Sequence, residues 1–121
     1  MKMFILALML SSMIATGQVL WKMGLHNKKE IFSQGIFKLS LYRSIISSPY
    51  IIIGVVIYAG ATILWLYLLS RYDLSKVYPI LSIAFIIVLF AARFLLQEKV
   101  SLTQWLGTII IVSGIYLITR P

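Results

Sequence analysis

The chain has 121 residues, of which 61% are hydrophobic and 12% are charged, and its formal net charge is +8. A soluble domain is about half apolar and about one quarter charged, so this composition excludes an ordinary water-soluble globular protein, and the absence of cysteine excludes disulfides and thiol chemistry. The Lys and Arg residues stand at the ends of apolar runs, where anionic lipid headgroups attract them, which favours a membrane protein over one that binds nucleic acid.

Four apolar segments follow one another along the chain, each of roughly 20 residues, the length that crosses ~30 Å of hydrocarbon as an α-helix. They predict transmembrane helices at about residues 4–25, 49–70, 77–96 and 102–118. The first segment follows Lys2 as in a signal peptide, but no small-residue cleavage site follows it, so we expect a retained helix. None of the segments alternates apolar with polar residues as barrel strands do. The predicted fold class is therefore an all-α integral membrane protein, with a single four-helix domain over residues 1–121.

The segment between the first two predicted spans, residues 26–47, is less regular. Ser40, Arg43, Ser44 and Ser47 recur in it at helical spacing among apolar residues. This pattern is typical of an amphipathic helix lying at the membrane interface. An ordinary long loop fits the same residues.

Positive charge is distributed unevenly between the two membrane sides. With both chain ends on one side, seven basic residues fall on the side of the 26–47 segment and four on the side of the chain ends. Because Lys and Arg are enriched in cytoplasmic loops, this difference predicts a cytoplasmic 26–47 segment and chain ends on the opposite side. The difference is small enough to be compatible with insertion in both orientations.

A polar stripe interrupts the first span. Gln18 and Lys22 are four residues apart and therefore share one face of a helix. Polar groups inside a bilayer are costly and mark functional sites, so this face is a candidate wall of a substrate cleft, with Lys22 binding phosphate or another anion. The alternative is that Lys22 extends to the lipid headgroups while Gln18 hydrogen-bonds a neighbouring helix.

Arg93 is a second candidate cation, near the end of the third predicted span. That span starts with Pro79 in its first turn, where a missing N–H costs little. Chain tracing puts Arg93 at the same membrane side as Lys22, so the two side chains are candidates for one anion site. Alternatively, both are ordinary membrane anchors, or Arg93 pairs with Glu98.

Aromatic and hydroxyl side chains form further candidate walls. On the third span, Ser82 shares a face with Arg93, and Tyr78 lies near that face, whereas Tyr58, Thr62 and Trp65 lie on one face of the second span. Such a surface suits the stacking of a sugar or the binding of an amphiphile. Helix packing and an interfacial aromatic belt are the alternatives.

Two glycines mark one face of the last span. Gly107 and Gly114 are seven residues apart, and small residues at helical spacing let two helix backbones approach closely in a membrane. They predict a contact with a second chain or with a neighbouring helix.

Residues that carry catalysis or bind metal are scarce. Glu30, Asp73 and Glu98 all lie near turns, and His26 is the only histidine. A proton-coupled antiporter usually needs a carboxylate within a span, and a metal site needs several ligands. No glycine-rich phosphate loop and no Ser-His-Asp set is present. We therefore expect no enzyme activity, no catalytic residue, no metal and no cofactor.

Several motifs, taken in order, resemble those of the drug/metabolite transporter superfamily. "GQVLWK" lies on the first span, and residues 76–118 read "KVYPILSIAFIIVLFAARFLLQEKVSLTQWLGTIIIVSGIYLI". This second half, with a Pro, a following Glu and two Gly on the last span, is similar to an EamA-type repeat. Within the superfamily, the chain most resembles the small subunits of the aminoarabinose-phosphoundecaprenol flippase, over nearly its whole length.

The resemblance implies a flippase subunit of the bacterial inner membrane that translocates an undecaprenyl-phosphate-linked sugar among membrane lipids. Members of the group work as dimers, which implies a homodimer or a heterodimer with a related small subunit, and Gly107 and Gly114 are then candidates for the interface. The candidate substrate-binding residues are Gln18, Lys22, Tyr58, Trp65, Tyr78, Ser82 and Arg93.

Two other functions remain as alternatives. Lys22 and the last two spans also resemble the small multidrug resistance proteins, which export small molecules. The hallmark of those proteins is a glutamate midway along the first helix, and this chain has Ile14 near that place. The other alternative is a non-transporting membrane protein that assists the assembly of a larger enzyme.

Overall fold

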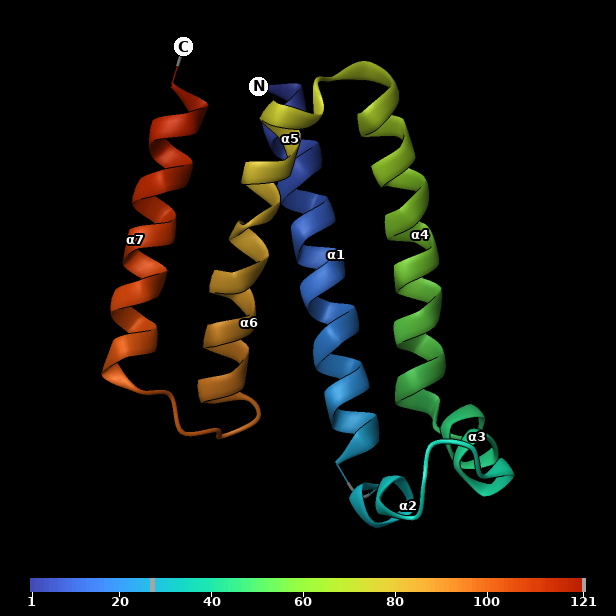
Figure 1. Cartoon of the computed structure of the whole chain (residues 1–121). Helices are drawn as coiled ribbons and strands as arrows, with labels where there is room; N and C mark the ends of the chain where they lie inside the picture. The colour runs from blue at the N-terminus through green and yellow to red at the C-terminus, as the bar shows by residue number, and fades with distance from the viewer. Residues whose placement is uncertain (27, 121) are drawn as a thin grey trace.

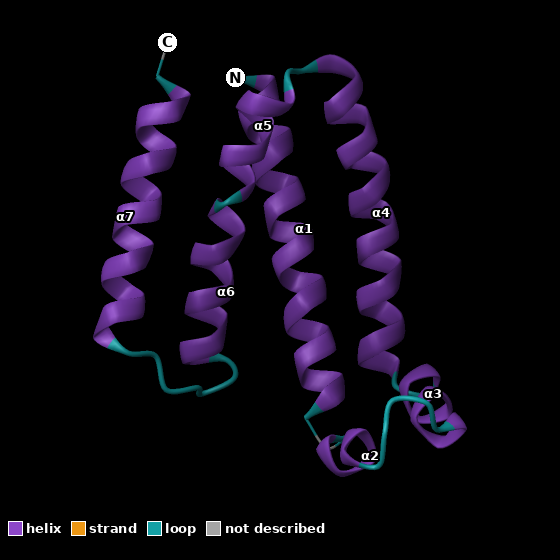
Figure 2. Ribbon diagram, in the orientation of Figure 1, coloured by secondary structure: helices purple, strands orange, loops and turns teal. Residues whose placement is uncertain are grey.

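The computed structural model describes residues 1–26 and 28–120, and every regular element in this part of the chain is a helix (Figure 2). The helices are α1 (Lys2–Leu25), α2 (Lys29–Ser33), α3 (Leu39–Ile46), α4 (Pro49–Arg71), α5 (Leu74–Leu81), α6 (Ile83–Phe94) and α7 (Leu102–Thr119). Within the described residues, four spans are long and apolar enough to cross a membrane: α1, α4, α5 together with α6, and α7. The predicted all-α class with four such spans is confirmed.

The spans stand side by side in the order α7, α5 with α6, α1 and α4 (Figure 1). Both chain ends lie at one end of this bundle, and α2 and α3 lie at the other end. This is the relative placement expected for the chain ends and the 26–47 segment. Which end faces the cytoplasm stays a prediction from the distribution of basic residues.

The buried core is thin and lies where α1 packs against α4 and α5. Leu10, Leu68, Val77 and Ile80 are among its fully buried side chains. Most apolar side chains elsewhere on the spans are exposed, as Ile110 on α7 is at 71%. In a bilayer this exposure carries little penalty, because lipid tails are as apolar as the side chains themselves.

Two glycines allow α1 and α4 to approach closely. A Cβ atom on Gly17 would lie 2.6 Å from Cδ2 of Tyr58, and one on Gly54 would lie 2.5 Å from Cδ1 of Trp21. The two rings occupy the space that the glycines leave and stack on each other, with centroids 4.5 Å apart and planes at 18°. The indole N–H of Trp21 also donates to the carbonyl oxygen of Ile51 at 3.2 Å. These contacts fix the ring of Tyr58 between the two helices.

The third span differs from the single helix expected over residues 77–96. Helix α5 already begins at Leu74, so Pro79 lies inside a helix and not in its first turn. A proline in a helix interior lacks the N–H that the carbonyl four residues earlier needs, and its ring crowds that carbonyl. The chain tightens just after it at Ser82, whose N–H donates to the Pro79 carbonyl oxygen at 3.1 Å. The span is therefore two helices that meet at Ser82 (Figure 2).

The segment between the first two spans forms two short helices, α2 and α3, and not one long loop. Helix α3 buries Leu41 and exposes Leu39 and Tyr42. The ammonium group of Lys28 donates to the carbonyl oxygen of Ser44, which ties the start of α2 to α3. The position of these helices on a membrane surface stays a prediction.

Candidate functional site

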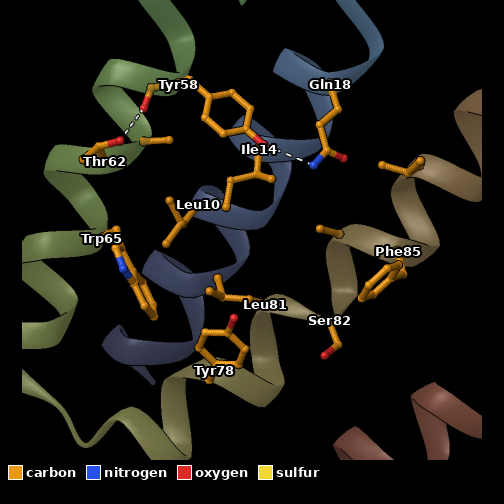
Figure 3. Close-up of a pocket in the computed structure, with 13 residues that line it drawn as sticks. Leu10, Ile14, Gln18, Tyr58, Thr62, Trp65, Tyr78, Leu81, Ser82 and Phe85 are labelled. Carbon is orange, nitrogen blue, oxygen red and sulfur yellow. Dashed lines mark hydrogen bonds between the residues drawn. The ribbon is translucent and has the colours of Figure 1, made fainter. Parts of the chain in front are cut away.

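A cavity of about 480 Å³ lies between α1, α4, α5 and α6 (Figure 3). We term it the aromatic pocket; its lining residues are Leu10, Ile14, Gln18, Tyr58, Ala61, Thr62, Trp65, Tyr78, Leu81, Ser82, Ala84, Phe85 and Val88. Five of the substrate-binding candidates predicted from the sequence are among them: Gln18, Tyr58, Trp65, Tyr78 and Ser82. The structure thus brings together candidates from three spans that are distant in the chain.

Aromatic rings form much of the wall of this pocket. Tyr58 and Trp65 come from α4, and Ser82 and Phe85 lie across the cavity from them (Figure 3). The ring of Trp65 meets that of Tyr78 edge to face, with centroids 6.0 Å apart and planes at 65°. Amphipathic rings of this kind can stack on a sugar or an apolar chain while their polar atoms hydrogen-bond, and the volume falls within the roughly 300–1,000 Å³ of ordinary ligand sites.

Three hydrogen-bonding side chains, Gln18, Tyr58 and Thr62, stand on the α1–α4 side of the aromatic pocket. The Gln18 amide Nε2 donates to the Tyr58 hydroxyl oxygen at 3.1 Å, which links α1 to α4 (Figure 3). This bond agrees with the alternative that Gln18 hydrogen-bonds a neighbouring helix. An amide has two N–H donors and one carbonyl acceptor, so this single contact leaves Gln18 able to bind a ligand as well. The Thr62 hydroxyl is engaged within α4, because it donates to the Tyr58 carbonyl oxygen at 2.9 Å.

A second cavity, of about 760 Å³, lies at the end of the bundle that carries α2. We term it the charged pocket; its lining residues are Lys22, Met23, Leu25, His26, Lys29, Phe32, Tyr50, Leu95, Leu96 and Glu98. Lys22 follows Gln18 by one helical turn, which is ~6 Å along the axis of α1. One face of α1 therefore leads from the aromatic pocket to the charged pocket.

The charged pocket contains an ion pair that the sequence did not predict. Lys22 Nζ lies 3.4 Å from Glu98 Oε1, and the two side chains are 59% and 44% exposed. The expected alternative partner of Glu98 was Arg93, and that pairing is wrong because the chain turns after α6 and brings Glu98 to α1. Arg93 is exposed at the end of α6 and lines neither the aromatic pocket nor the charged pocket.

Within residues 1–26 and 28–120, Gly107 and Gly114 do not meet another helix. A Cβ atom built on either glycine finds no neighbouring atom within 4 Å. The contact with a neighbouring helix of this chain, one of the two possibilities for these glycines, is therefore not formed. The close approach of helices occurs instead at Gly17 and Gly54.

No group of three or more His, Asp or Glu side chains in residues 1–26 and 28–120 lies close enough to hold a metal ion. The two pockets offer aromatic stacking, hydrogen bonding from Gln18 and Tyr58, and the opposite charges of Lys22 and Glu98. These groups can hold a molecule by stacking, hydrogen bonds and ion pairs.

Sequence reasoning missed two features of this site. Gly17 and Gly54 were not recognised as the close contact between helices, although Gly17 directly precedes Gln18 and Gly54 lies one turn before Tyr58. The charged pocket also includes His26 and Lys29, which had been attributed to the loop after α1. A loop residue that faces a pocket carries no periodic pattern, so only its charge could have drawn attention to it.

Comparison with known proteins identifies the family of the chain. Residues 1–120 match the sequence model of the EamA-like transporter family. The chain belongs to the EamA-like transporter family. This family is one of transporters and not of enzymes, as the sequence predicted, and the four spans make this member a multi-pass membrane protein.

Several similar bacterial proteins carry the name "Probable 4-amino-4-deoxy-L-arabinose-phosphoundecaprenol flippase subunit ArnE". The protein from Aeromonas salmonicida is 41% identical over 71 residues, which are 59% of this EamA-family chain and 62% of that protein. The match thus spans less than two thirds of the Aeromonas protein. The one from Photorhabdus laumondii is 30% identical over 116 residues, which are 96% of this chain and 95% of that protein. No solved structure matches the chain. The predicted resemblance to these flippase subunits is confirmed.

Proposed function

We propose that this EamA-family chain is one subunit of a flippase that moves an undecaprenyl-phosphate-linked amino sugar across a bacterial inner membrane. The observation that carries the proposal is the polar face of α1, where Gln18 and Lys22 connect the aromatic pocket to the charged pocket within an apolar bundle. A polyprenyl-linked sugar has the matching composition, because its tail is apolar while its sugar and phosphate are polar. The substrate named for the similar ArnE proteins supports the same class.

In this proposal the aromatic pocket binds the sugar of the headgroup and the charged pocket binds its phosphate. The rings of Tyr58, Trp65 and Tyr78 stack on the sugar, and Gln18 hydrogen-bonds its hydroxyls, with Ser82 on the opposite wall. The phosphate needs a compensating cation, because an unpaired charge in a low-dielectric site is very costly. Lys22 supplies that cation.

Arg93 lies outside both pockets, so its role differs from that of Lys22. It is exposed near the end of α6, at the same end of the bundle as the charged pocket. In this position it attracts the anionic lipid phosphate before entry, by the attraction that basic residues exert at a membrane surface. Its contribution is therefore to the capture of substrate at the bundle end.

A second subunit completes the transporter in this proposal. The similar proteins are named as subunits, and α7 presents Gly107 and Gly114 to open space. Small residues beside open space let another membrane helix approach the backbone. We infer a dimer through α7, with an identical chain or a related small subunit. This chain is then one four-helix domain and forms half of the transporter.

Export of small molecules is the second candidate function, because the size and aromatic lining of the aromatic pocket also suit a compact amphiphilic drug. One observation speaks against it. Ile14 lines this pocket near the place where a multidrug exporter of this superfamily would hold its glutamate, and no acidic side chain is among the lining residues. A cationic drug would find no counter-charge in this pocket.

Native mass spectrometry of the protein released from membrane lipid tests the proposal. We expect the chain to appear with one further small subunit and to retain an undecaprenyl-phosphate-linked sugar in preference to added undecaprenyl phosphate without sugar. Retention of bulk phospholipid alone, in a preparation that contains the lipid-linked sugar, would contradict the proposed substrate. An isolated single chain that nevertheless transports would contradict the proposed dimer.

A further inference from the structure

The charged pocket holds two opposite charges that can separate. Lys22 comes from α1 and Glu98 from the loop between α6 and α7, and their charged atoms are 3.4 Å apart. Charge-assisted hydrogen bonds are typically shorter, at about 2.7–2.9 Å. Both side chains are about half exposed, and exposed ion pairs are weakly held. A ligand that offers each partner a better counter-charge can therefore replace this contact.

Glu98 is singled out among the acidic residues of the chain. The sequence has three, Glu30, Asp73 and Glu98. Asp73 pairs with Lys76 at 2.9 Å at the other end of the bundle, and Glu30 lies on α2 and lines neither the aromatic nor the charged pocket. Glu98 is thus the one carboxylate that faces either of these two cavities.

The backbone around Glu98 is held in an uncommon conformation. The preceding residue, Gln97, has a φ of 55°, in the left-handed region that side-chain-bearing residues seldom adopt. The Glu98 N–H donates to the Ala92 carbonyl oxygen at 2.9 Å. A left-handed residue followed by such a hydrogen bond is a common C-terminal cap of a helix. Here it ends α6 and fixes the carboxylate opposite α1.

The substrate named for the similar proteins has two charges of its own. Its sugar carries a primary amine at position 4, which is protonated near neutral pH, and its phosphodiester is an anion. Such a headgroup is zwitterionic, so an apolar cleft with a single cation leaves the ammonium group without a partner. A buried ammonium group without a counter-charge is very costly.

We propose that the Lys22–Glu98 pair is the recognition site for this zwitterion as it enters through the charged pocket, before the sugar reaches the aromatic pocket, with the phosphate replacing Glu98 at Lys22 and the sugar ammonium replacing Lys22 at Glu98. The proposal rests on the proposed flippase function and adds selectivity for a sugar that bears an amine. Lys29 and His26 line the same cavity and strengthen its attraction for the phosphate. In the absence of substrate, the two side chains neutralise each other.

Transbilayer movement of two lipids in proteoliposomes tests this inference. One lipid is undecaprenyl-phosphate-linked 4-amino-4-deoxy-arabinose, and the other is its N-acetylated form, in which the amine has no charge. The protein is reconstituted with the small subunit that co-purifies with it, and the ratio of the two rates is measured. For wild type we expect the amine-bearing lipid to move faster. For Glu98→Gln we expect this ratio to fall by about tenfold, which corresponds to ~1.4 kcal/mol.

A purely structural role for the Lys22–Glu98 ion pair predicts a different result. If Glu98 only tethers the loop to α1, then Glu98→Gln slows both lipids by the same factor and the ratio stays at its wild-type value, which would overturn the inference. The charge-exchanged pair Lys22→Glu with Glu98→Lys separates the two roles again, because it rebuilds a tether but reverses the charges that meet the zwitterion. Recovery of the wild-type ratio in that variant would also overturn it.

Asp73→Asn is the matched control, since it removes the carboxylate of the Asp73–Lys76 pair outside both pockets. We expect it to keep the wild-type ratio of rates, and a fall equal to that of Glu98→Gln would count against a local role for Glu98. A wild-type protein that moves neither lipid would contradict the proposed flippase function itself. Movement of both lipids at equal rates by wild type would contradict only the selectivity proposed here.

Discussion

Gly17 and Tyr58 are packed so closely across the α1–α4 contact that a Cβ atom at residue 17 would lie 2.6 Å from the tyrosine ring. The same ring stacks on Trp21 and accepts a hydrogen bond from Gln18 at its hydroxyl. A backbone contact in the core therefore decides where one wall of the aromatic pocket stands. Packing and binding are coupled at this point.

Replacing Gly17 tests that coupling. Gly17→Ala should displace the Tyr58 ring and lower stability by ~1–3 kcal/mol, as overpacking of a filled core does. The measurement is unfolding in mixed micelles, together with retention of the lipid-linked sugar. Gly60→Ala is the control on the same helix pair, because its Cβ would meet only the flexible end of Met13 at 3.2 Å. Equal losses in the two variants would show that the Gly17 contact has no special role.

The Gln18–Tyr58 hydrogen bond should contribute modestly to stability. Tyr58→Phe removes the hydroxyl but keeps the stacking on Trp21, and Gln18→Ala removes the donor. Each should cost ~1 kcal/mol, and the double variant little more than either alone, because both remove one bond. Tyr67→Phe on the same helix is the control, since its hydroxyl makes no hydrogen bond within the described residues. Fully additive losses in the double variant would mean that the two side chains do not interact.

Larger side chains on α7 should weaken association of the subunits. Gly107→Leu and Gly114→Leu add bulk where, in the described part of the chain, a Cβ meets no neighbouring atom within 4 Å, so the fold of the single chain should tolerate them. A second helix could not approach this face as closely. Crosslinking in membranes is the readout, with unchanged insertion as the control. If both variants associate as wild type does, the interface lies elsewhere.

Orientation can be measured on single-cysteine variants, because the chain has no cysteine of its own. Ser33→Cys in α2 and Ser101→Cys before α7 should resist an impermeant thiol reagent added from outside, since the basic 26–47 segment favours the cytoplasm. Ser75→Cys, at the end of the bundle that carries the chain termini, should react. The reverse pattern would overturn the predicted orientation, and partial labelling at all three positions would indicate dual insertion.

Apolar segment length predicted the spans well, because a bilayer demands about 20 apolar residues for each helix and leaves few alternatives. The same reasoning misplaced Pro79. An apolar run shows no boundary where a helix breaks inside the membrane, so the start of α5 at Leu74 and the break at Ser82 were not visible. Helical spacing did identify Tyr58 and Trp65 as one wall, since side chains four and seven residues apart share a face.

The contacts between spans could not be predicted from the sequence, for a physical reason. The pairing of Glu98 with Lys22 depends on how the loop after α6 turns, and the φ of 55° at Gln97 is not a preference of glutamine. The pairs Gly107 with Gly114 and Gly17 with Gly54 show the same limit of prediction from sequence. Spacing alone drew attention to Gly107 and Gly114, whereas Gly17 and Gly54 meet because their two helices happen to cross at those residues.

The most direct test of the account is transbilayer movement of undecaprenyl-phosphate-linked aminoarabinose in proteoliposomes that contain the chain and its co-purifying subunit. We predict that wild type accelerates movement over protein-free liposomes, and that Lys22→Ala lowers the rate by at least about tenfold at equal amounts of inserted protein. Lys22→Arg should keep part of the activity, because the charge remains while its geometry changes. Wild-type movement no faster than in protein-free liposomes, or full activity in the Lys22→Ala, Arg93→Ala double variant, would contradict it.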